Sequence, residues 1–174
     1  MILPKVDIKK ILYATDLSES ARHAFAYAVS LANAYGASIT ILHVLFNVSN
    51  VDSFASFYIG QDEWKKIKQH TLDDARQALI GKKRENVAIQ EILTRFSETA
   101  SAEVESPATI TDEIIIKKGN PEDNILQQAE ERNCDVIVMG SHGHGVIAEA
   151  VIGSIARKVL RRSKKPVLVV RLPE

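Results

Sequence analysis

The residues best suited to chemistry in this sequence lie in one glycine-rich stretch near the carboxyl end. Gly140, Gly143 and Gly145 are followed by Gly153 and Ser154, with the spacing G-x2-G-x9-G-S from the first glycine. Glycines let backbone N–H groups approach an anion closely, and a serine at a helix start can cap the helix and bind phosphate. The stretch predicts a phosphate site. The alternative is a turn plus a helix cap, but this does not explain the second glycine site.

Other phosphate-binding motifs fit the same residues less well. Residues 140–145 satisfy G-x4-G, but Val146 stands where a P-loop has lysine. Residues 143–148 satisfy G-x-G-x-x-A, yet no ribose-binding acid follows about 20 residues later. A phosphoacceptor receiver domain needs an aspartate where this chain has residues 117–119, Lys-Lys-Gly. The sequence therefore disfavours a Walker-type NTPase, a dinucleotide site and a receiver domain.

Neither a metal centre nor a catalytic nucleophile is predicted. His43, His142 and His144 lie near the glycine-rich stretch, but His43 falls within a predicted strand, and the other two fit a pocket lining better than a zinc site. Ser141 lacks the G-x-S-x-G context of a nucleophile elbow. We therefore assign no catalytic residue and no protein-bound metal, and we expect any divalent ion to arrive on the phosphates of the ligand.

The elements that must position this stretch alternate between strand and helix. Short apolar, β-branched runs predict strands at residues 11–14, 39–45, 113–116, 135–139 and 167–170. Helical spacing and start signals predict helices capped by Ser18, Asn120 and Ser154, with a further one entered at Asp62. Gly36 ends the first of them. The pattern predicts an α/β fold: a five-stranded parallel sheet, doubly wound, in an order such as 3-2-1-4-5.

A doubly wound sheet binds ligands beyond the carboxyl ends of its strands, where the strand order reverses. Here that point lies between the first and fourth strands, so the loops after Ala14 and after Met139 are the ones that matter. The first of these loops contains Thr15 and Asp16. Asp16 is either a ligand-binding carboxylate or a helix cap or Asx-turn residue, and its position alone does not decide between these roles.

Length and composition describe the whole chain. Its 174 residues predict one domain, 1–174, with an insertion or an extended second helix at about 82–110. The 22 basic residues balance the 22 acidic ones, so no global field favours nucleic acid or a membrane.

The cations of residues 157–165 indicate a solvated helix face. The irregular segment 46–60 is rich in aromatic residues, which we expect to pack on the body of the domain; the alternatives are a lid over the site and a partner surface. Cys134 is the only cysteine, which fits a cytoplasmic location.

The glycine and serine spacing, together with Asp16, resembles the ATP-binding subgroup of the universal stress protein family. Matching stretches are residues 10–16 (KILYATD), 42–44 (LHV), 119–121 (GNP), 135–143, 153–154 and 165–170 (KPVLVV). Two features depart from the family pattern: Ala14 stands where proline is frequent, and residues 82–110 exceed the usual link. The resemblance implies a Rossmann-like fold similar to the adenine nucleotide alpha hydrolases.

The resemblance also implies a function and a site. It implies a cytoplasmic stress-response module that binds ATP with Mg or Mn; the alternatives are a slow ATPase or nucleotidyl-transfer enzyme, and a nucleotide-free interaction module. The implied nucleotide-binding residues are Ala14, Thr15, Asp16, Val44, Met139, Gly140, His142, Gly143, Gly153, Ser154 and Ile155. Among these, the Val44 backbone faces adenine, Asp16 and Gly140 lie near the ribose, and the last four hold the phosphates.

The last strand, residues 167–170, is an edge strand in the predicted order. It is apolar on both faces, and its free backbone groups invite pairing with another chain. Charged residues and prolines bracket it, which is also how proteins keep an edge strand single. The resemblance implies a homodimer formed through this strand about a twofold axis.

Overall fold

The computed structural model describes residues 5–45, 91, 93–95, 98, 111–143 and 152–173. Strands and helices alternate along these ranges, except that only the helical residues 91, 93–95 and 98 are described between the second and third strands. The elements are β1 (Lys10–Thr15), α1 (Glu19–Tyr35), β2 (Ser38–Leu45), β3 (Thr111–Lys118), α5 (Pro121–Glu131), β4 (Val136–Gly140), α6 (Ser154–Arg162) and β5 (Val167–Val170). The irregular segment 46–60, the helix expected from Asp62 and most of the insertion at 82–110 lie outside the described residues.

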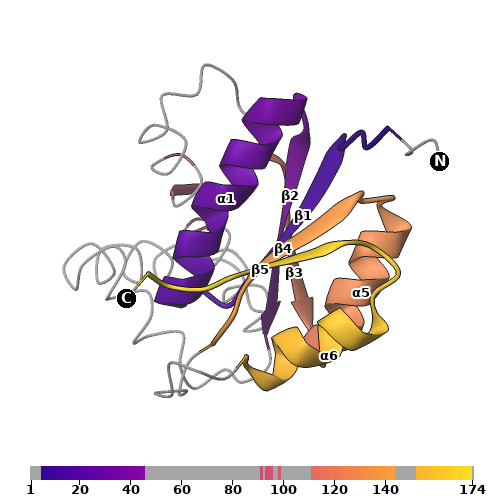
Figure 1. Cartoon of the computed structure of the whole chain (residues 1–174). Coiled ribbons are helices and arrows are strands. Elements are labelled where there is room, and N and C mark those ends of the chain that lie inside the picture. The colour runs from indigo at the N-terminus through magenta and orange to yellow at the C-terminus, as the bar shows by residue number, and fades with distance from the viewer. Residues whose placement is uncertain are drawn as a thin grey trace, which may run out of the picture.

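The five strands form one parallel sheet in the order β3-β2-β1-β4-β5, as predicted. Helix α1 covers one face of the sheet, and α5 and α6 cover the other (Figure 1). Strand β1 is central and pairs with both β2 and β4, which makes it the point where the strand order reverses. The fold is therefore the predicted Rossmann-like, doubly wound α/β architecture.

Local signals mark the starts of α1 and α5 and the end of α1, as expected. The Ser18 hydroxyl accepts the Ala21 N–H at 3.2 Å at the start of α1, and Gly36 ends that helix at φ 66°. This left-handed conformation suits glycine, which has no Cβ to clash. At the start of α5 the Asn120 side chain accepts the Asp123 N–H at 3.3 Å, and Pro121 is the first helical residue.

The predicted capping role of Ser154 in α6 is wrong. Gly153 is the capping residue, Ser154 is the first residue of the helix, and no side-chain cap is found for its N–H groups in the described part of the chain. The physical reason is a tertiary hydrogen bond: the Gly153 N–H donates to the Ser141 carbonyl oxygen at 2.8 Å, which fixes where the helix begins. The exposed Ser154 hydroxyl is consequently not used by the helix.

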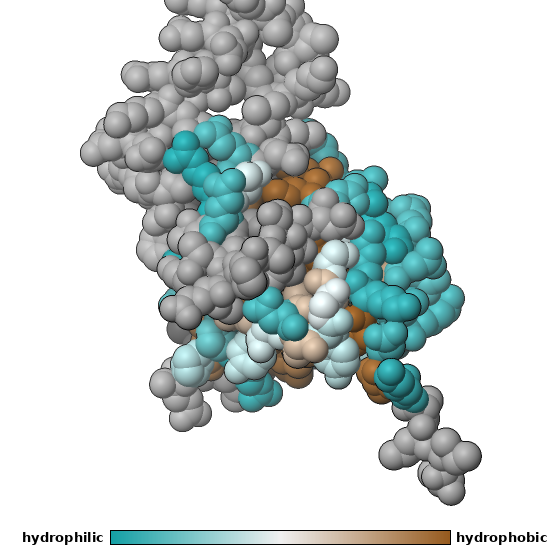
Figure 2. Space-filling view, turned by 90° about the horizontal axis from the view of Figure 1, so that it is seen from above, coloured by the Kyte–Doolittle hydropathy of each residue, from teal (hydrophilic) through white to brown (hydrophobic). Residues whose placement is uncertain are grey.

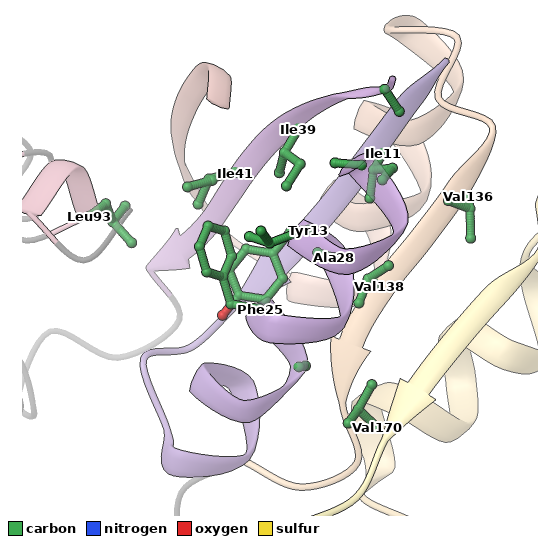
Figure 3. Packing of buried hydrophobic residues seen from close by; sticks show 14 of the residues in the cluster. Ile11, Tyr13, Phe25, Ala28, Ile39, Ile41, Leu93, Val136, Val138 and Val170 are labelled. Carbon is green, nitrogen blue, oxygen red and sulfur yellow. The ribbon is translucent and has the colours of Figure 1, made fainter. Parts of the chain in front are cut away.

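The core on the α1 side of the sheet is built around an aromatic pair. The rings of Tyr13 and Phe25 lie 4.9 Å apart at a tilt of 57°, and both residues are fully buried (Figure 3). The Tyr13 hydroxyl donates to the Ala21 carbonyl at 2.6 Å, so its buried polar end is satisfied. Leu93 is helical and packs into the same cluster from within the long segment between β2 and β3. The first turn of α1 is thereby held against β1.

The core on the other face joins the sheet to α5 and α6. Its strand residues alternate with those of the first cluster, as expected for a sheet covered on both faces. Ala14 and Met139, both predicted site residues, belong to this cluster and are buried. Their side chains therefore form part of the floor beneath the strand ends.

One face of the described part is mainly polar where its residues are coloured in Figure 2. Figure 2 shows one face, on which hydrophilic residues predominate and hydrophobic residues appear in smaller groups. Exposed large hydrophobic residues include Tyr27, Tyr35 and Leu160. Within the described ranges, no helix combines the length and the apolar composition needed to cross a membrane.

The cations of α6 lie on a solvent-exposed helix face, as their sequence indicates, and two of them also form ion pairs with α5. Lys158 Nζ lies 2.8 Å from Glu122 Oε2, and Arg162 contacts both Glu122 and Asp123, with 2.9 Å to Asp123 Oδ1. Glu122 and Asp123 lie in the first turn of α5, where acidic side chains also favour the helix dipole. The Glu122 side chain is only 11% exposed. These ion pairs join the two helices on one face of the sheet.

This cluster predicts a pH-dependent contribution to stability. The hydrogen bond from Lys158, supported by Arg162, lowers the pKa of Glu122 below its ordinary value of 4.5. The folded form then favours ionised Glu122, so the contribution is present above the ordinary pKa and lost as pH falls through the folded pKa. Glu122→Gln is expected to lower Tm near neutral pH, and its difference from the wild type should shrink in acid.

Thermal melts of both proteins at about pH 7 and about pH 3 check this expectation. Glu130→Gln is the matched control, because Glu130 meets Lys164 at 3.5 Å in an exposed pair and should have little effect at either pH. A Glu122→Gln difference that is independent of pH would contradict the assignment.

Candidate functional site

The carboxyl ends of three neighbouring strands meet at one edge of the sheet (Figure 1). Ala14 on β1 pairs with Leu42 on β2 and with Met139 on β4, and Thr15 pairs with His43. The structure therefore brings the predicted residues at the ends of β1, β2 and β4 to a common edge. Val44, one residue beyond His43, is half-buried at this edge and packs against the second core cluster.

The turn between β1 and α1 is fixed by its own side chains. The Thr15 hydroxyl accepts the Leu17 N–H at 3.0 Å, and Asp16 Oδ1 accepts the Ser18 N–H at 3.0 Å. Leu17 has a φ of 66°, an uncommon conformation for a bulky residue. Asp16 is thus the Asx-turn residue that the sequence analysis considered.

The second oxygen of Asp16 lies against the glycine-rich loop. A Cβ atom placed on Gly143 would lie 2.5 Å from Asp16 Oδ2, closer than real side chains approach. Gly143 is itself exposed. A glycine at this position therefore allows the loop after β4 to touch the carboxylate after β1. The two loops predicted to form the site are in direct contact.

Gly140 has a packing role that the sequence did not reveal. A Cβ atom there would lie 2.7 Å from Ser20 Oγ and 2.8 Å from the Ala21 backbone nitrogen. These atoms belong to the first turn of α1, which crosses β4 at this point. The glycine is thus required for helix α1 to pack on the strand end, whether or not a ligand also approaches it.

Hydrogen bonds tie the loop after β4 to its neighbours at both ends. The Ser141 N–H donates to the Val170 carbonyl at 2.7 Å, and the Ser141 carbonyl accepts the Gly153 N–H at 2.8 Å. Helix α6 therefore begins beside the end of β4. The N–H groups of Ser154 and Ile155, in its first turn, have no acceptor within the helix, and such groups are suited to bind an anion.

Two histidine rings are fixed near the same edge. His43 Nδ1 lies 2.8 Å from the Thr15 carbonyl oxygen, and His142 Nδ1 lies 2.7 Å from Ser141 Oγ. His144 falls outside the described residues. The described residues contain no group of three His, Cys, Asp or Glu side chains that could hold a metal ion.

Ser141 is a polar residue of the site that the sequence analysis did not include. Its side chain is fully buried and contacts His142, while its backbone joins β5 to the start of α6. The only sequence signal was its position inside the glycine-rich stretch. The missing nucleophile elbow argued against nucleophilic catalysis by Ser141. The burial of its side chain and its contacts with β5 and α6 could not be inferred from that pattern.

A family model and several related proteins match nearly the whole chain. The family model described as "Universal stress protein family" matches residues 7–171. Universal stress protein MJ0577 of Methanocaldococcus jannaschii is 30% identical over 173 residues, covering 94% of each chain. Universal stress protein YxiE of Bacillus subtilis is 30% identical over 162 residues, covering 93% of this chain and 98% of its own.

Solved structures show the same similarity in three dimensions. The structure of MJ0577 matches with a TM-score of 0.63 at 28% identity, covering 97% of this chain and 99% of that one. A universal stress protein solved in complex with cAMP matches with a TM-score of 0.61 at 25% identity, covering 95% of this chain and 98% of that one. The family model, the full-length relatives and the shared fold agree, and the chain belongs to the universal stress protein family.

Proposed function

We propose that the chain binds ATP at the edge where β1, β2 and β4 end. The observation that carries this proposal is the contact between Gly143 and Asp16, beside a helix start whose N–H groups lack side-chain caps. This arrangement offers backbone donors for phosphate and a carboxylate acceptor for sugar hydroxyls. The related universal stress protein solved with cAMP supports an adenine nucleotide as the ligand class.

The proposed roles follow the position of each residue. The Val44 backbone faces adenine, Asp16 and Gly140 lie near the ribose, and the buried Ala14, Thr15 and Met139 form the floor. His142 lines the pocket. Four residues near the start of α6 and in the preceding loop hold the phosphates: Gly143, Gly153, Ser154 and the N–H of Ile155. Ser154 is exposed and its hydroxyl does not cap α6, so it can donate a hydrogen bond to a phosphate oxygen.

Two features of the site fit a nucleotide that carries a divalent cation. Gly143 brings backbone without a side chain against the Asp16 carboxylate, and the buried His142 Nε2 has no hydrogen-bond partner among the described residues. A Mg or Mn ion bound to the phosphates would neutralise their charge near the Asp16 carboxylate. The ion is expected to enter with the nucleotide.

We assign the protein a regulatory or sensory role in a cytoplasmic stress response. Phosphoryl transfer depends on positioning and on cationic groups that neutralise charge. The stretch 140–156 contains neither lysine nor arginine, so the cradle consists of backbone N–H groups and small side chains. That composition favours holding a nucleotide over rapid hydrolysis. A slow ATPase remains the second candidate function because the proposed site places phosphates close to Asp16.

Turnover is therefore expected to be far below the roughly 10 per second of a typical enzyme. The physical reason is that the Asx turn with Ser18 fixes the Asp16 carboxylate at the proposed ribose position, so it is not placed to orient an attacking water at the phosphates. Steady-state phosphate release with ATP and Mg or Mn measures the rate. Hydrolysis at an ordinary enzymatic rate that disappears in Asp16→Ala would favour the enzyme instead.

Binding itself is tested on the wild-type chain. Mass spectrometry of small molecules released from the purified protein identifies any nucleotide that it carries, and calorimetry compares ATP, cAMP and adenosine with and without Mg or Mn. We expect ATP with a divalent cation to bind most tightly of the three. A protein that releases no nucleotide and gives no heat with any of these ligands would support the interaction-module alternative and overturn the proposal.

A further inference from the structure

The buried Ser141 and the half-buried His142 form a pair in which one buried polar atom has no partner among the described residues. Ser141 Oγ lies 2.7 Å from His142 Nδ1, and His142 Nε2 is buried without a hydrogen-bond partner in the described residues. We infer that Ser141 positions His142 as a neutral Nε2–H donor to a phosphoryl oxygen of the bound nucleotide. This inference rests on the proposed ATP site and adds a specific donor to it.

The tautomer follows from the surroundings of the serine. Ser141 is 0% exposed, and His142 Nδ1 is the one side-chain hydrogen-bond partner that the described residues give its hydroxyl. If Nδ1 carried the proton, the hydroxyl would accept, and its own O–H would be a buried donor without an acceptor. An unmet buried donor is costly, so the hydroxyl is expected to donate to Nδ1. The proton of the neutral ring is then on Nε2.

The backbone around the pair restricts where the ring can go. The Ser141 N–H donates to Val170 on β5, and the Ser141 carbonyl accepts from Gly153 at the start of α6. The His142 carbonyl lies 3.4 Å from the Ser18 hydroxyl, and its N–H lies 3.5 Å from Ser20 Oγ, both long contacts with the start of α1. The ring is thus attached to a segment held between β5, α6 and α1.

A phosphoryl oxygen is the acceptor that best completes this arrangement. A buried N–H without an acceptor is destabilising, and a ligand that supplies the acceptor gains the full benefit of the hydrogen bond. His142 lies between Gly140 and Gly143, in the loop that also approaches Asp16 and the first turn of α6. A charged phosphate oxygen makes a stronger bond with an N–H donor than a neutral acceptor does. The gain should therefore depend on the phosphates of the ligand.

Two variants of the histidine separate the donor from the rest of the ring. His142→Ala removes the donor and is expected to weaken ATP binding roughly tenfold or more, the range for a hydrogen bond to a charged group. His142→Gln places an amide N–H donor at a similar reach and should recover part of that loss. Adenosine, which has no phosphate, should bind the wild type and both variants alike.

The serine is tested by a spectroscopic signature. Nitrogen NMR of histidine-labelled protein, with the His142 signals assigned by their loss in His142→Gln, is expected to show a neutral ring protonated at Nε2 without ligand. Addition of ATP, but not adenosine, should shift the Nε2 signal. Ser141→Ala should populate the other tautomer and weaken ATP binding severalfold with adenosine unaffected. A protein in which Ser141→Ala does not fold leaves the histidine variants to decide the inference.

The outcomes separate this inference from the ATP proposal. Wild-type protein that binds ATP, together with a His142→Ala variant of unchanged affinity, would overturn the inference and leave the ATP site standing. A wild-type ring protonated at Nδ1 would overturn it as well. Wild-type protein that binds no nucleotide would overturn the ATP proposal, and the phosphate donor with it.

Discussion

Gly143→Val is expected to abolish ATP binding while the protein stays folded. The new Cβ would lie 2.5 Å from Asp16 Oδ2, so the variant must displace either the carboxylate or the loop. Both groups belong to the proposed site, and the remaining valine atoms would occupy the space of a phosphate. We expect an affinity loss of roughly a hundredfold or more, which corresponds to about 2.7 kcal/mol. The fold should persist because Gly143 is exposed and the clash meets a side chain.

Calorimetry with ATP and a divalent cation measures the loss, and a thermal melt checks folding. Ala34→Val is the matched control, because it adds a valine at an exposed position of α1 outside the proposed site and should bind ATP normally. Asp16→Ala provides a second comparison: if displacement of the carboxylate is the cause, it should also weaken binding. A folded Gly143→Val protein with unchanged ATP affinity would refute the site assignment.

The architecture could be predicted from sequence because its signals are local. Apolar β-branched runs predicted the strands. Ser18 and Asn120 predicted two helix starts and Gly36 a helix end, and each of these three acts through hydrogen bonds within a few residues. Parallel strands joined by helices leave few topologies, so the order could be anticipated. Helix α6 is the exception. Its start depends on the hydrogen bond between Gly153 and Ser141, which are far apart along the chain.

The residues of the candidate site could be predicted from the sequence, but the contacts between them could not. The spacing of the glycines identified the loop, and the strand order placed it beside Asp16. Whether a glycine serves a ligand or the packing of the fold is decided by atoms distant in sequence. Gly140 approaches the first turn of α1, whereas Gly143 approaches a carboxylate. The burial of Ser141 and its contact with His142 likewise exist only once β4, β5 and α6 are assembled.

Strand β5 lies at the edge of the sheet and pairs only with β4 among the described strands. The carbonyls of Pro166 and Val170 accept hydrogen bonds from the β4 side, from Ile137 and Ser141. In a parallel pair, every second residue of an edge strand forms backbone hydrogen bonds with the neighbouring strand. The intervening Val167 and Val169 therefore direct their N–H and C=O groups to the open edge. Two copies of this chain can pair there about a twofold axis.

We therefore expect the wild type to be a homodimer and two substitutions at Val169 to weaken it. Val169→Lys places a charge on a half-buried side chain that packs toward α5 and α6, so it costs stability as well as association. Val169→Pro removes an N–H that faces the open edge and spares the hydrogen bonds to β4, so it acts mainly on pairing.

Light scattering after gel filtration at micromolar concentration should give about 38 kDa for the wild type, twice the 19.2 kDa of one chain. Both variants should approach the mass of one chain, with Val169→Pro still binding ATP. A wild-type mass near that of one chain would refute the dimer, and a Val169→Pro protein that stays dimeric would move the interface away from β5.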